Sequence, residues 1–116
     1  MPEDAYNGSI RISEKVIAIM AGAAALSTPG IAGMSTGKAD GLVKRLSGKN
    51  MQTGVAVVMG QGEVALELHA SVHYGHPIHK VCRQLQRHVC ESVETMTGLT
   101  VTAVHVKVDN IVISAL

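Results

Sequence analysis

The sequence predicts an α+β fold, a two-layer sandwich in which two helices cover one face of a sheet of about four strands. Apolar residues recur at spacings of three and four through residues 78–96, as they do on the buried side of a helix. Apolar and polar residues alternate through residues 63–74 and 100–108, which is typical of strands with one buried face. We therefore expect the order β-α-β-β-α-β in a single domain that spans residues 1–116, with an ordered core at about residues 8–113.

The first strand and the first helix are expected next to each other. Residues 9–13 alternate, so they predict a short strand whose two isoleucines face inward. Ser13 suits the N-cap of the following helix, and Glu14 places a negative charge in its first turn, where the helix dipole favours it. We expect this helix at residues 14–27. Its apolar residues point in nearly every direction, so a second cover, such as another subunit, is expected over it.

The segment between residues 30 and 54 is expected to be a glycine-rich loop with one short helix at residues 39–46. Between residues 36 and 54 it has a local net charge of +3. Its basic residues are Lys38, Lys44, Arg45 and Lys49, against one acid, Asp40.

The second half of the chain has clearer boundaries. Glycines at 60 and 62 supply the hairpin turn between a strand at residues 55–59 and the strand at residues 63–74. Pro77 suits the start of the second helix, and Gly98 suits its end. After the strand at residues 100–108, Asp109-Asn110 predicts a turn and residues 111–113 a short edge strand.

Composition excludes several classes of function. The chain has no Trp, no Phe and two Tyr, so it offers almost no aromatic platform for stacking bases. Its formal net charge of +1 gives no electrostatic case for wrapping nucleic acid. The acidic start, the two cysteines and the absence of an apolar stretch of about 20 residues predict a cytoplasmic protein that does not span a membrane.

No arrangement of residues predicts catalysis, and we expect neither an enzyme nor a cofactor. The acids do not pair for acid–base work, and the phosphate-binding and nucleophile motifs are absent. The candidates for a metal site are His73, His76 and His79, around the turn before the second helix. Because no carboxylate lies within this cluster, surface histidines beside a loop are the favoured interpretation.

A second function class rests on Gly30-Ile31-Ala32-Gly33. This GxxG pattern after a helix also occurs in KH-type modules, which bind RNA, and the basic segment follows it here. The pattern lacks basic residues between its glycines. A small RNA-binding module is therefore the alternative, and nucleic acid is not the expected partner.

Several segments together resemble the alkaline shock protein family, also called the Gls-type envelope stress response family, of Gram-positive bacteria. The resemblance covers about residues 8–113 and rests on residues 8–13, 16–21, 29–34, 72–75, 81–89, 93–99 and 104–108. The Tyr74-Gly75 pair and the sequence Glu94-Thr95-Met96-Thr97-Gly98-Leu99 are its most specific elements. Three departures concern surface recognition: Pro77 stands ahead of Ile78 where the family has proline after isoleucine, Lys80 stands where the family has an acid, and His105 stands where Asn is usual.

The resemblance implies a non-catalytic interaction or scaffold protein of the envelope stress response. Such proteins self-associate and bind protein partners, among them a membrane-anchored relative, at the cytoplasmic side of the cell membrane. No catalytic residues come with the family. We expect a homo-oligomer, with contact surfaces on the first helix and the basic segment. The predicted contact residues are Ile17, Met20, Lys38, Lys44, Arg45 and Lys49.

Overall fold

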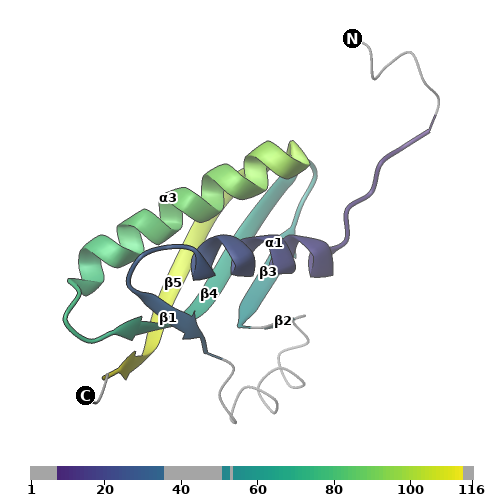
Figure 1. The fold of residues 1–116 in the computed structure, drawn as a ribbon. Coiled ribbons are helices and arrows are strands. Elements are labelled where there is room, and N and C mark those ends of the chain that lie inside the picture. Colours follow the sequence, from purple (N-terminus) through teal and green to yellow (C-terminus); the bar gives the residue numbers. More distant parts are fainter. Residues whose placement is uncertain (1–7, 36–50, 53, 114–116) are drawn as a thin grey trace.

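The computed structural model describes residues 8–35, 51–52 and 54–113 of the chain. Within these residues, five strands form one sheet, and both helices pack on the same face of it (Figure 1). This confirms the predicted α+β class and the two-layer arrangement. In chain order the elements are α1 (Glu14–Leu26), β1 (Ile31–Met34), β2 (Met51–Gln52), β3 (Val55–Met59), β4 (Glu63–His73), α3 (Ile78–Thr97) and β5 (Thr100–Val112).

Strand β4 lies at the centre of the sheet. It pairs with β5 in parallel along its whole length, from Glu63 to His73. Its other edge is shared end to end by β3, which pairs antiparallel with residues 64–68, and β1, which pairs antiparallel with residues 70–72. Helix α3 is the crossover between the two parallel strands, as parallel pairing of consecutive strands requires.

Two bulges in β5 decide which of its side chains face the helices. The register with β4 shifts at Thr102 and again at Asp109, each of which is an extra residue on β5. Each extra residue reverses the alternation, so Val101 and Ile111 both pack against the core although simple alternation would place Val101 on the opposite face from Val104. The predicted turn at Asp109-Asn110 is therefore wrong, because β5 passes through it without a break.

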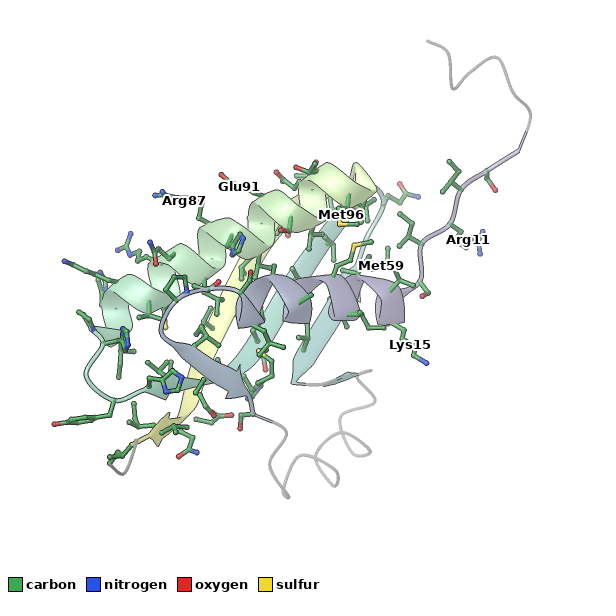
Figure 2. All side chains as sticks on the ribbon, in the orientation of Figure 1. Arg11, Lys15, Met59, Arg87, Glu91 and Met96 are labelled. Carbon is green, nitrogen blue, oxygen red and sulfur yellow. The ribbon has the colours of Figure 1, made fainter. Side chains whose placement is uncertain are left out.

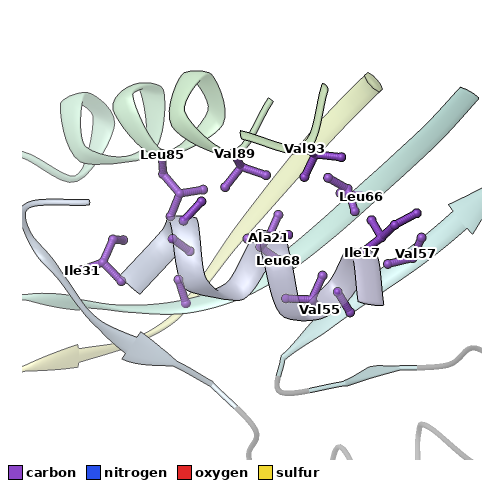
Figure 3. Packing of buried hydrophobic residues seen from close by; sticks show 14 of the residues in the cluster. Ile17, Ala21, Ile31, Val55, Val57, Leu66, Leu68, Leu85, Val89 and Val93 are labelled. Atoms are coloured by element: carbon purple, nitrogen blue, oxygen red, sulfur yellow. The ribbon is translucent and has the colours of Figure 1, made fainter. Parts of the chain in front are cut away.

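The core lies between the helices and the sheet. Fully buried side chains of α3 meet those of α1 and β4 there, and the short alanine side chains of α1 let this helix lie close to its neighbours (Figure 3). The central members are Ile17, Ala21, Val55, Leu66, Leu68, Leu85, Val89 and Val93.

The predicted strand at residues 9–13 is absent, since these residues pair with no strand in the part of the chain that the structure describes. Their extended backbone ends in a helix cap: Ser13 has φ −75° and ψ 155°, and its Oγ accepts a hydrogen bond from the N–H of Val16 at 3.2 Å. Ile12 packs against the core, whereas Ile10 is exposed. The alternation of residues 9–13 thus reflects the core contact of Ile12 and the helix cap of Ser13, and no strand. The predicted helix at 14–27 is confirmed to within one residue.

Strands β1 and β2 lie where the sequence predicted a loop. Ile31 is buried and pairs with Val72, and the Gly30 carbonyl accepts from the N–H of His73 at 2.9 Å. Glycine content therefore misled the prediction, because the edge of β4 is available to any segment that can reach it. The predicted short helix at 39–46 lies outside the described residues.

Candidate interaction surfaces

The outward side of α1 carries a row of apolar side chains. Val16, Ile19 and Leu26 are 42%, 52% and 55% exposed, and Ala23 in the same row is also exposed. Their spacing of three, four and three residues places them along one side of the helix. No residue from 16 to 26 is charged. One side of the all-apolar helix is therefore buried in the core, and the other is left without a cover among the described residues.

The contact residues predicted from the sequence have different positions. Ile17 is 0% exposed and belongs to the core, so its predicted role in contacting a partner was wrong: it points toward the sheet. Met20 is partly buried against the core. The basic residues Lys38, Lys44, Arg45 and Lys49 lie outside the described residues. The sequence missed the outward row because an all-apolar helix does not indicate which side is buried.

The face of the sheet away from the helices carries a cluster that joins β4 to β5. The ring of His69 lies between two carboxylates: its Nε2 is 2.9 Å from Oε2 of Glu67, and its Nδ1 is 2.8 Å from Oδ2 of Asp109. Lys107 Nζ lies 3.7 Å from the same Glu67 oxygen. A carboxylate only accepts hydrogen bonds, so both ring nitrogens must carry protons to satisfy this arrangement. The geometry is therefore that of a charged imidazolium.

The pKa of His69 reflects competing effects. Burial is the largest and acts to lower the pKa, but the hydrogen bonds and charges of Asp109 and Glu67 together outweigh it and raise the pKa above 6.5. The sequence did not reveal this cluster, because Asp109 reaches the ring only through the bulge in β5. Lys107 and His105 pair with His69 and Glu67 across the strands and are the other titratable neighbours on β5.

We expect the cluster to make stability depend on pH. The folded-state pKa of His69 is raised, so its contribution is complete below 6.5 and is lost as the pH rises through the folded-state value. The free energy of unfolding of the wild type should exceed that of His69→Gln by roughly 1–2 kcal/mol at about pH 6. The difference should shrink at about pH 8.5, as measured by urea denaturation. His79→Gln, which replaces an exposed histidine of α3, is the control, and an equal pH dependence in both variants would contradict this role.

The three histidines considered for a metal site do not converge. The rings of His73 and His76 have their centroids 6.3 Å apart, and His79 is exposed on the first turn of α3. Within the described residues, no group of three or more His, Cys, Asp or Glu side chains could hold a metal ion.

The two cysteines are free thiols on α3, and both are half-buried. Burial raises the pKa of Cys82, and burial together with the nearby charges of Glu94 and Glu91 raises the pKa of Cys90. A thiol with a raised pKa is poorly ionised at neutral pH, so neither side chain is activated as a nucleophile.

The GxxG segment does not form a projecting loop. Gly30 occupies a turn with φ +94°, whereas Ile31–Met34 form β1 and pair with β4. KH-type recognition uses a GXXG loop that clamps backbone nucleotides. The strand geometry here gives the RNA-binding alternative no structural support.

Neither helix of the described residues meets the requirements of a membrane span. Helices α1 and α3 each fail to be both long enough and apolar enough to cross a bilayer.

Comparison with known proteins agrees with the resemblance seen in the sequence. A sequence model of the alkaline shock protein 23 family, described by a cell envelope-related function, matches residues 2–113. YloU of Bacillus subtilis is 34% identical over 106 residues, which cover 90% of this chain and 88% of the relative. YqhY of the same organism is 28% identical over 106 residues (91% and 78%), and Spy1614 of Streptococcus pyogenes is 31% identical over 107 residues (90% and 88%). All three are named as uncharacterized proteins. No solved structure matches the chain.

Proposed function

Because the chain belongs to the alkaline shock protein 23 family, whose function is related to the cell envelope, we propose that it is a non-catalytic scaffold protein that self-associates and binds protein partners. The proposed place of action is the cytoplasmic side of the cell membrane, where a membrane-anchored relative is one proposed partner. The resemblance to alkaline shock proteins, confirmed by the family match, supports this role.

The outward row of α1 is the observation that carries self-association. Val16, Ile19, Ala23 and Leu26 form a narrow apolar surface with the spacing that two packed helices use. Two copies can bury the same row against each other about a two-fold axis, since an isologous contact needs only one self-complementary patch. Ala23 in the middle of the row allows the two helices to approach closely.

Self-association can be tested by removing the row. The variant Val16→Ser/Ile19→Ser/Leu26→Ser should raise the dissociation constant of a dimer by about four powers of ten, because each copy loses three half-buried side chains that contribute about 1 kcal/mol each. Light scattering over a range of concentrations measures the molar mass. All three side chains are at least 42% exposed in the structure, so the fold should tolerate the change.

The matched control removes apolar side chains that are equally exposed elsewhere. Val58 on β3 and Met96 on α3 are 56% and 65% exposed, so Val58→Ser/Met96→Ser should leave the molar mass unchanged. A wild-type protein that stays monomeric at high micromolar concentration would remove self-association from the proposal, and equal effects of both variants would remove the role of α1.

A further inference from the structure

One end of the molecule combines exposed apolar and basic side chains. The turn from β4 to α3, the start of α3 and the end of β5 all lie there (Figure 1). The N–H of Tyr74 donates to the carbonyl of Val112 at 2.8 Å, so the turn is tied to the end of β5. Tyr74, Ile78 and Ile113 are 72%, 42% and 69% exposed, although such side chains are normally covered.

Basic side chains surround the start of α3. His76, His79, Lys80 and Arg83 are exposed and line an open cavity of about 560 Å³ with Pro29 and Pro77. Among the described residues, no acidic side chain lines this cavity. Arg87 extends the basic surface by one turn, and the first acid along α3 is Glu91.

The order of charges in α3 opposes its own helix dipole. Acids stabilise the first turn of a helix and bases the last turn, yet α3 has no acid in its first turn and no base in its last. Its start also lacks a side-chain cap. Helix α1, by contrast, has both the Ser13 cap and Glu14. Helix α3 thus lacks the stabilising cap and charge that α1 has, and such a departure is expected where the residues serve a function rather than stability.

We propose that this end of the molecule, which we call the basic tip (Tyr74, Ile78, Ile113, His76, Lys80 and Arg83), binds the surface of a bilayer that contains anionic phospholipids. Tyr74 and the two isoleucines enter the boundary between headgroups and acyl chains, where a tyrosine ring is well suited. Lys80 and Arg83 contact the lipid phosphates. Aliphatic side chains beside the bases favour a bilayer over a nucleic acid, which would be bound through charge and stacking alone.

Direct lipid contact goes beyond the proposed scaffold role and does not depend on it. The outward row of α1 and the basic tip share no residue. The two can therefore be removed separately, with self-association read by light scattering and lipid binding read by sedimentation of vesicles.

The test uses the full chain with vesicles of phosphatidylcholine, with and without about 30% phosphatidylglycerol. The wild type should bind the anionic vesicles and not the neutral ones, and the binding should weaken as salt rises. Lys80→Gln/Arg83→Gln should weaken it about 25-fold, from about fivefold for each cation near an anionic surface. Tyr74→Ser/Ile78→Ser should weaken it about tenfold or more, since it removes the inserted side chains.

A matched control exists at the opposite end of the molecule, where Arg11 and Lys15 are exposed (Figure 2). Arg11→Gln/Lys15→Gln changes the net charge by the same amount and should bind vesicles as the wild type does. Absence of binding to anionic vesicles, or equal weakening by this control, would overturn the proposal. So would a single-stranded RNA that binds as tightly as the vesicles while the Tyr74→Ser/Ile78→Ser variant retains full vesicle binding, because the tip would then be a general polyanion surface.

Discussion

Replacing Gly30 by alanine is expected to lower the free energy of unfolding by about 3 kcal/mol, whereas the same change at Gly33 should leave it nearly unchanged. Gly30 has φ +94°, and a Cβ there would lie 2.7 Å from Cγ2 of Val81 on α3. Both the backbone strain and the clash oppose alanine. At Gly33 a Cβ would meet nothing within 4 Å. Urea denaturation of the two variants measures the difference.

A double variant separates the two causes. In the Gly30→Ala background, Val81→Ala should recover the free energy of unfolding that is lost to the clash and leave the loss caused by backbone strain. The effects of the two substitutions should therefore not be additive. Equal effects of alanine at Gly30 and Gly33 would mean that the turn before β1 does not fix the packing of α1 and β1 against α3.

Leu85→Ala is expected to lower the free energy of unfolding by about 3–4 kcal/mol, because it leaves a cavity in the centre of the core. Leu85 is fully buried on the side of α3 that faces α1 and the sheet (Figure 3). Since small domains are stable by only about 5–15 kcal/mol, the loss should be visible as a large fall in melting temperature. Gln84→Ala, one position away and exposed, should change stability by less than about 0.5 kcal/mol. A small effect of Leu85→Ala would place the core elsewhere.

The elements predicted best are those with long patterns. Helix α3 has a buried side of Val81, Leu85, Val89 and Val93, and such a spacing over 20 residues fits no other structure. Strand β4 alternates over its full 11 residues because one face meets the helices. In both α3 and β4, the residue type indicates which side of the element is buried, once in every turn of the helix and at every second residue of the strand.

The elements predicted poorly depend on pairing with a distant strand. Strand β1 has four residues and follows directly after Pro29 and Gly30, so only the free edge of β4 makes it a strand. The bulges at Thr102 and Asp109 could not be predicted either, because an extra residue is defined only by comparison with the partner strand. Simple alternation along β5 would therefore place Val101 on the face opposite to the one it occupies.

The candidate surfaces were predictable only in part. The sequence predicted that the apolar first helix needs a second cover. It could not distinguish the buried Ile17 from the outward Ile19 two residues later. Three histidines were the candidates for a metal site, yet the histidine that binds two carboxylates is His69, which is not one of the three. One partner lies two residues away on β4 and the other on a bulge 40 residues away, and no local spacing records the second.

The backbone of His69 binds the chain at the point where β1 and β3 meet on the edge of β4. Its carbonyl accepts from the N–H of Ser35 at 2.7 Å, and its N–H donates to the carbonyl of Gly54 at 2.9 Å. The chain thus leaves the edge of β4 and returns to it at a single residue. The backbone of one residue therefore anchors both strands on this edge of β4, and a proline at position 69, which has no N–H, would break the ladder where the two strands meet.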